Sequence, residues 1–198
     1  MKNLLLIGDS IREGYDKSVK KALEGKANVI FPDENCRFAS YVLRNFHEYL
    51  KDTNGDIDVI HWNAGLWDCL RLFEEEPHTP LDIYAYYIER ICIRIRKLCP
   101  NAKVIFATST KVLSEKTPRD FKRYNEDIEK YNEVAVEIAK KYGFKINDLY
   151  AFSVTLPEET FSDDVHYYTP AGRRAFTNQV LSVVLPELGI DEEIEYQE

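Results

Sequence analysis

Two short motifs near the ends of the chain carry the residue types of a hydrolytic site. Gly8-Asp9-Ser10-Ile11 places a serine directly after an apolar run, and Asp163-Asp164-Val165-His166 places an aspartate three residues before a histidine. A serine becomes a nucleophile when a neighbouring imidazole takes its proton, and a carboxylate on the other ring nitrogen fixes the tautomer. The pattern therefore indicates that Ser10, His166 and Asp163 act together on an acyl group.

Each motif also has a purely structural interpretation. A serine between a strand and a helix often caps the helix, and an Asp-x-x-His turn can do the same for the helix that follows it. Neither motif alone is specific for catalysis. Their combination indicates a catalytic site only if the fold brings the two ends of the chain together.

The hydrophobic pattern predicts such a fold. Short apolar runs indicate buried strands, and apolar residues recur at helical spacing between them. The predicted strands are 4–7, 29–31, 57–62, 104–107 and a weak 144–146, and the helical stripes cover 39–50, 84–98, 124–142 and 176–184. Continuous apolar strands that alternate with helices are typical of a parallel sheet covered on both faces. We expect an α/β fold, a three-layer α/β/α sandwich around about five parallel strands.

The same fold predicts where the site lies. In open parallel sheets ligands bind at the carboxyl ends of the strands. Polar clusters follow the first four predicted strands, and a fifth cluster precedes the last helix; they cover residues 8–12, 32–37, 63–68, 108–110 and 162–170. The two motifs therefore meet at one edge of the sheet.

Composition excludes several classes of function. The 198 residues carry a net charge of −8, which disfavours nucleic-acid binding, because that binding depends on Lys and Arg. No stretch approaches the ~20 apolar residues of a membrane helix, and the apolar start is too short for a signal peptide. Four cysteines without a C-x-x-C pair predict reduced thiols and no metal site. We expect a cytoplasmic protein with one domain over residues 1–190 and a solvated acidic tail over 191–198.

Together, the two motifs resemble those of the GDSL esterase/lipase family, also called SGNH hydrolases. Gly8-Asp9-Ser10-Ile11 is similar to the first block of that family and Asp163-Asp164-Val165-His166 to its last, so the resemblance spans nearly the whole chain. It implies a flavodoxin-like sandwich and a catalytic triad of Ser10, Asp163 and His166. It also implies an ester hydrolase that needs no metal or organic cofactor.

The middle blocks depart from the family pattern. Cys36 stands where the family has a glycine whose backbone N–H serves the oxyanion hole, and a backbone donor survives this change. Trp67 stands where the family has an asparagine. We favour Asn63, at the end of a predicted strand, as the replacement amide donor, with the Trp67 indole as the alternative. The expected oxyanion hole thus consists of Ser10, Cys36 and Asn63.

Three neighbouring residues are weaker candidates for substrate binding: Asp9, Arg12 and Gly65. Arg12 orients an acidic group of the substrate, pairs with Asp68 or lies in solvent. His61 lies inside an apolar strand and is interpreted as a core histidine.

These observations predict a serine esterase that hydrolyses short acyl esters, with acetyl as the first candidate, because 198 residues leave little room for insertions. By resemblance, carbohydrate esters are a candidate class. One alternative is an SGNH-like binding domain that lost its oxyanion hole at Cys36 and Trp67. Another is a flavodoxin-like phospho-acceptor or nucleotide module that uses Asp9 with Thr108 and Lys111. An α/β-hydrolase would need Gly-x-Ser-x-Gly, which residues 8–12 do not match.

Overall fold

A five-stranded parallel sheet forms the centre of the computed structural model, which describes residues 1–53 and 55–197. The strand order is β2-β1-β3-β5-β7, with β1 (Lys2–Ile7), β2 (Ala27–Ile30), β3 (Val59–Trp62), β5 (Lys103–Ala107) and β7 (Lys145–Asn147). The register aligns Leu4 with Val29 on one side and with Val59 on the other. Counted within this sheet, the order is the flavodoxin-like 2-1-3-4-5.

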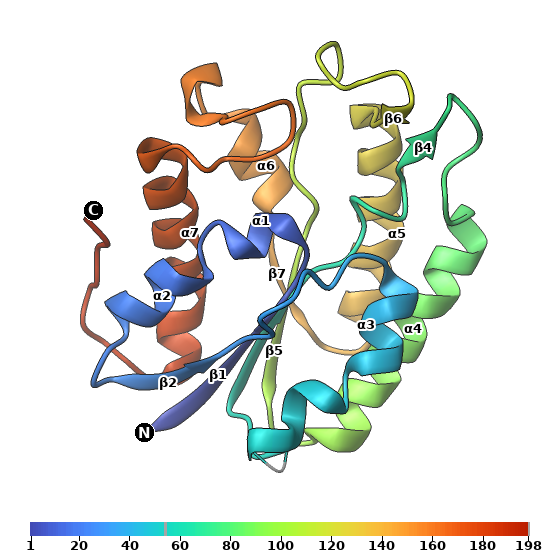
Figure 1. Ribbon diagram of the computed structural model, residues 1–198. Helices are drawn as coiled ribbons and strands as arrows, with labels where there is room; N and C mark the ends of the chain where they lie inside the picture. Colours follow the sequence, from blue (N-terminus) through green and yellow to red (C-terminus); the bar gives the residue numbers. More distant parts are fainter. Residues whose placement is uncertain (54, 198) are drawn as a thin grey trace.

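Helices cover both faces of the sheet, as Figure 1 shows. α2 and α7 pack together on one face, while α3, α4 and α5 lie side by side on the other. The helices are α1 (Ser10–Glu13), α2 (Asp16–Ala22), α3 (Ala39–Asn45), α4 (Leu81–Leu98), α5 (Asn125–Lys141), α6 (Leu149–Val154) and α7 (Pro170–Leu188), with 3-10 helices at Glu48–Thr53 and Glu158–Thr160. The predicted three-layer α/β/α sandwich is confirmed.

The central strands are buried on both faces, which explains their unbroken apolar runs. All four residues of β3 are buried, including His61, which is 0% exposed. The Asn147 side-chain amide lies 3.1 Å from His61 Nε2, and burial lowers the pKa of His61 to about 4. His61 is therefore a neutral core histidine, as predicted.

The sequence pattern missed the shortest elements. Helices α2 and α6 were not predicted, nor was a small two-stranded antiparallel sheet formed by β4 (Arg71–Leu72) and β6 (Phe121–Lys122). The predicted helix over 39–50 divides into α3 and a 3-10 helix. Elements of two to seven residues carry too few periodic positions to be recognised by hydrophobic spacing.

The four described acids of the C-terminal segment, Asp191, Glu192, Glu193 and Glu195, are exposed, but two contacts hold the segment against the helices. Tyr196 is only 8% exposed, and its backbone N–H donates to the Asn178 side chain of α7 at 2.7 Å. Glu192 forms an ion pair with Lys26 after α2. One aromatic residue and one ion pair therefore dock the segment against α7 and the turn after α2. None of the helices within the described ranges is long and apolar enough to cross a membrane.

Candidate active site

Ser10 is the first residue of α1 and follows β1 after the two residues Gly8 and Asp9. Asp9 caps the helix, because its carboxylate accepts the Ile11 backbone N–H at 3.0 Å. The Ser10 hydroxyl is therefore not needed as a cap. The Ser10 backbone N–H makes no hydrogen bond within the described residues, as is usual in a first helical turn. Ser10 presents both a hydroxyl and a free N–H at the carboxyl edge of the sheet.

His166 and Asp163 reach Ser10 from the loop that precedes α7. His166 Nε2 lies 2.7 Å from Ser10 Oγ, and His166 Nδ1 lies 2.8 Å from Asp163 Oδ2. The other oxygen, Asp163 Oδ1, accepts the backbone N–H groups of Val165 at 2.8 Å and His166 at 2.7 Å. The D-x-x-H spacing thus forms a closed turn that aims the imidazole at the serine.

Hydrogen bonds keep the Asp163 carboxylate ionised. Partial burial alone would raise the pKa of Asp163, but the backbone N–H groups of His166 and Val165, together with the His166 ring, outweigh it and lower the pKa. An ionised carboxylate on Nδ1 favours the tautomer with a bare Nε2. That nitrogen is the one that faces Ser10.

Tyr168 braces this pair and was missed by the sequence analysis. Its ring stacks on His166 with centroids 4.7 Å apart and planes at 23°, and its hydroxyl donates to the Ser10 carbonyl oxygen. A Cβ on Gly14 would lie 2.9 Å from the Tyr168 ring, so glycine is needed there. The only signal for Tyr168 in the sequence was its position two residues after the histidine.

A close approach at Gly172 holds the loop against α7. Thr169 caps the helix by accepting the Gly172 N–H, and the Thr169 hydroxyl donates to the Thr160 carbonyl at 2.8 Å. A Cβ on Gly172 would lie 2.4 Å from the Thr160 oxygen and 2.6 Å from the Tyr167 oxygen. The loop that carries Asp163 and His166 is thereby fixed at its two ends.

The expected oxyanion donors are engaged elsewhere. The Cys36 backbone N–H donates to the Gly8 carbonyl at 3.2 Å, and the Asn63 side-chain amide donates to the Ala107 carbonyl at 2.7 Å. Each bond joins the ends of two neighbouring strands. Such a tertiary contact cannot be recognised from residue type alone. The second N–H of the Asn63 amide faces Ser109 Oγ at 3.4 Å. Of the three predicted donors, therefore, only the Ser10 N–H has no acceptor among the described residues.

Trp67, the alternative donor, belongs to an aromatic wall. Its indole packs edge-on against Phe38 at 5.5 Å and Phe121 at 5.9 Å between ring centroids. No hydrogen bond from the Trp67 indole is formed within the described part of the chain. The side chain is half-buried and packs as a hydrophobic group.

Arg12 has a structural role instead of the expected contact with substrate. The side chain is 2% exposed, forms an ion pair with Asp16, and donates to the Pro32 and Glu34 carbonyls at 2.9 and 2.6 Å. It therefore fastens α1 and α2 to the loop after β2. The predicted alternative of an Arg12 pair with Asp68 is also wrong.

The other two weak candidates are likewise buried. Asp9 is 1% exposed, and desolvation raises its pKa. At Gly65 a Cβ would lie 2.5 Å from Ser109 Oγ, so this glycine permits close packing between the ends of β3 and β5. Neither residue presents a side chain to a substrate.

The structure argues against the phospho-acceptor alternative, because Asp9 and Thr108 have structural roles. Asp9 is too buried to accept a phosphoryl group from a partner. Thr108 donates to Asp148 at 3.0 Å and accepts the Tyr150 N–H at 2.9 Å, so it caps α6. Within residues 1–53 and 55–197, no group of three or more His, Cys, Asp or Glu side chains could hold a metal ion.

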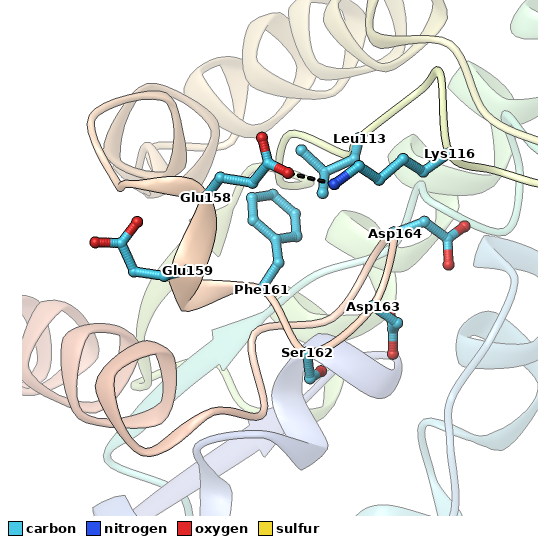
Figure 2. Close-up of a pocket in the computed structure, with 8 residues that line it drawn as sticks. All are labelled: Leu113, Lys116, Glu158, Glu159, Phe161, Ser162, Asp163 and Asp164. Atoms are coloured by element: carbon cyan, nitrogen blue, oxygen red, sulfur yellow. Dashed lines mark hydrogen bonds and ion pairs between the residues drawn. The ribbon is translucent and has the colours of Figure 1, made fainter.

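A pocket of about 490 Å³ adjoins the outer side of Asp163 (Figure 2). Two loops form it, one with Leu113 and Lys116 and the other running from Glu158 to Asp164. Figure 2 shows the Phe161 ring between Glu158 and Leu113, and the ion pair of Lys116 with Glu158 closes one end. The pocket offers carboxylates and one aromatic face next to the triad.

The whole structure is similar to solved structures of ester-cleaving enzymes. It matches the lipase/acylhydrolase from Enterococcus faecalis with a TM-score of 0.74 at 17% identity, over 100% of both chains. It matches the acetyl xylan esterase AlAXEase with a TM-score of 0.73 at 19% identity, over 92% of this chain and 99% of the other. Axe2, an acetylxylan esterase from Geobacillus stearothermophilus, matches with a TM-score of 0.69 at 17% identity, over 95% and 94%.

These likenesses show a shared fold, and they agree with the predicted flavodoxin-like α/β/α sandwich. No family model and no curated protein matches the sequence.

Proposed function

We propose that the chain is a carboxylic ester hydrolase of the SGNH type, with Ser10 as nucleophile, His166 as general base and Asp163 as the residue that orients it. The observation that carries this proposal is the continuous line from Ser10 Oγ to His166 Nε2 at 2.7 Å and from His166 Nδ1 to Asp163 at 2.8 Å. These three residues come from opposite ends of the chain. A structural cap would not need them aligned in this order.

The geometry supports a two-step reaction. Ser10 Oγ attacks the acyl carbon while His166 Nε2 takes the hydroxyl proton, and His166 then gives that proton to the leaving alcohol. A water, activated by the same nitrogen, releases the acid and restores Ser10. Asp163 stays ionised throughout and stabilises the imidazolium.

The assembled triad favours an enzyme over the alternative of a binding domain. Proton transfer needs the imidazole oriented toward Ser10, as the stacking of Tyr168 and the closed turn around Asp163 orient it, whereas ligand binding alone does not. Both arrangements restrict the imidazole to the orientation that faces Ser10.

The substrate class we favour is a short acyl ester, with acetyl as the first candidate and a carbohydrate as one possible alcohol. The described residues add little to the central sandwich beyond the two-stranded sheet of β4 and β6, which leaves little surface to hold a long acyl chain. Glu159 and Asp164 line the pocket beside Asp163 and form no ion pair among the described residues, and their carboxylates can accept hydrogen bonds from sugar hydroxyls. Two of the similar structures are of enzymes named for acetyl xylan.

A chain-length series tests this proposal. Purified protein is assayed with p-nitrophenyl acetate, butyrate and octanoate, beside Ser10→Ala and His166→Ala. We expect turnover that is highest for acetate and that falls at least ~10³-fold in both variants. Equal turnover in wild type and Ser10→Ala would overturn the assignment, whereas a maximum at octanoate would overturn only the acyl preference.

A further inference from the structure

Arg123 is a buried arginine without a carboxylate partner. It lies between β6 and α5, is 4% exposed, and forms no ion pair with any residue in the described ranges 1–53 and 55–197. Its Nε donates to the Leu66 carbonyl at 2.6 Å. The two Nη groups, which carry four of the five guanidinium donors, have no hydrogen-bond partner among those residues.

Aromatic rings fix the guanidinium in place. Its central carbon lies 5.1 Å from the Phe121 ring centroid and 5.8 Å from that of Trp67. Leu66 binds Nε and two rings pack against the guanidinium plane. The Nη groups are therefore the donors that remain available for a hydrogen bond to a ligand. Burial lowers the pKa of Arg123, which reflects the cost of keeping this charge out of water.

The loop that anchors Arg123 adjoins the Ser10 turn, because Leu66 follows Asn63 by three residues and a Cβ on Gly8 would lie 3.7 Å from the Asn63 Cβ. Arg123 is the foremost positive charge acting on Asp9, the neighbour of Ser10, and it also acts on Asp164, the neighbour of Asp163. Neither carboxylate is close enough to pair with it. With its Nε bound to Leu66 and its plane beside Trp67, the guanidinium belongs to the loops at the carboxyl ends of β1 and β3, on the side of the aromatic wall.

The site needs a donor of this kind. A developing oxyanion is stabilised by preorganised donors, and losing one typically costs ~10²–10³-fold in kcat. Cys36 and Asn63 donate to other groups, so of the three predicted oxyanion donors only the Ser10 N–H remains. Arg123 is anchored to the carbonyl of Leu66, in the loop after β3 where the family pattern expects its asparagine donor.

We propose that an Arg123 Nη group donates to the oxyanion formed on the ester carbonyl, opposite the Ser10 N–H. As the bond from Ser10 Oγ to carbon forms, the carbonyl π pair moves to oxygen, and the hydroxyl proton passes to His166 Nε2. The negative oxygen lies between the two donors. When it collapses, the bond to the alcohol breaks and the alcohol takes the proton from His166. This inference rests on the proposed esterase function.

The test compares Arg123→Met and Arg123→Lys with wild type on p-nitrophenyl acetate, a neutral substrate. We expect Arg123→Met to lower kcat by ~10²–10³-fold with KM changed only a few-fold, because the interaction is made in the transition state. Arg123→Lys keeps the positive charge but loses the planar guanidinium with its two Nη groups. Its kcat should lie between those of wild type and Arg123→Met.

Arg96→Met is the matched control. Arg96 also donates to a backbone carbonyl, that of Tyr142 at 2.8 Å, and its guanidinium lies 4.7 Å from the Phe144 ring centroid. It sits near Ala102, at the opposite edge of the sheet from Ser10. Its kcat should remain within a few-fold of wild type, even if both Met variants lower the melting temperature.

Four outcomes would overturn the inference. Unchanged kcat in Arg123→Met, with wild type active and Ser10→Ala inactive, removes Arg123 from the chemistry and leaves the esterase intact. A rise of KM confined to an anionic substrate, the p-nitrophenyl monoester of succinic acid, assigns Arg123 to anion recognition instead. An inactive wild type overturns the esterase itself. Should Arg123→Met fail to fold, a kcat in Arg123→Lys equal to wild type also excludes the role.

Discussion

The Tyr168 hydroxyl lies 2.5 Å from the carbonyl oxygen of Ser10, so one tyrosine bridges the two halves of the proposed triad. The same residue stacks on His166. Its contact with Ser10 is through the backbone, and its contact with the imidazole is through the ring face. We interpret Tyr168 as a positioning residue that keeps His166 Nε2 on the serine.

Replacing Tyr168 should separate these two contacts. Tyr168→Phe retains the stacked ring and loses the hydrogen bond, and we expect kcat to fall by about 3- to 10-fold, in line with a bond worth ~1 kcal/mol. Tyr168→Ala loses both contacts and should lower kcat further. Reactivity of Ser10 toward a fluorophosphonate, measured as a rate, should follow the same order. Equal rates in all three proteins would contradict a positioning role.

Gly172→Ala should destabilise the protein, although helix propensity alone predicts a gain of ~1 kcal/mol. The added Cβ would meet two backbone oxygens, those of Thr160 and Tyr167, which cannot move as a side-chain tip can. We expect a loss of ~1–3 kcal/mol in the free energy of unfolding and a displaced His166 with reduced kcat. Ser182→Ala, on the exposed side of the same helix, is the control. A more stable Gly172→Ala with full activity would contradict the close approach.

Asp68 should make stability fall as the pH rises. It is 0% exposed, accepts the Ala39 N–H at 2.9 Å, and burial raises its pKa to about 7. Since the unfolded-state pKa is about 3.9, the native state binds more protons between these values, and the free energy of unfolding decreases from about pH 4 to pH 7. Asp68→Asn keeps an oxygen for Ala39 without the charge.

Melting temperatures at two pH values check this prediction. Asp68→Asn should melt above wild type at pH 8 and close to it at pH 4, while Asp33→Asn, at an exposed site, should change little at either. A melting temperature that Asp68→Asn lowers at pH 8 but not at pH 4 would show that the charged form is the stabilising one, and the prediction would be wrong.

Asp163→Asn should reduce kcat by ~10²–10⁴-fold, because an amide on Nδ1 favours the tautomer that cannot take the serine proton. The amide oxygen can still accept the Val165 N–H, so the turn should persist. Asp164→Asn removes the same charge one residue away and should stay within a few-fold of wild type. Similar kcat values for the two variants would contradict the role of Asp163.

The sequence predicted the parts of the site that depend on local pattern. Ser10 follows a strand and His166 follows Asp163 by three residues, and both relationships survive in the fold because the strand order brings their loops together. The five strands were found because each is a continuous apolar run in a doubly covered sheet.

The sequence could not reveal the hydrogen bonds that cross between loops. Cys36 and Asn63 have suitable donors, yet those donors close the ends of neighbouring strands. Arg12 has the charge for substrate binding, but its guanidinium is paired with Asp16 and bonded to two backbone carbonyls. Arg123 follows a strand of two residues that periodicity does not detect, so its place beside the site emerges only from the tertiary structure.

Labelling with a fluorophosphonate, followed by mass analysis of the digested protein, tests the central claim most directly. The account predicts one adduct per chain on the peptide that contains Ser10, no adduct there in Ser10→Ala, and a much slower reaction in His166→Ala. An adduct that forms at another residue, or at the same rate in wild type and Ser10→Ala, would contradict the assignment of Ser10 as the nucleophile.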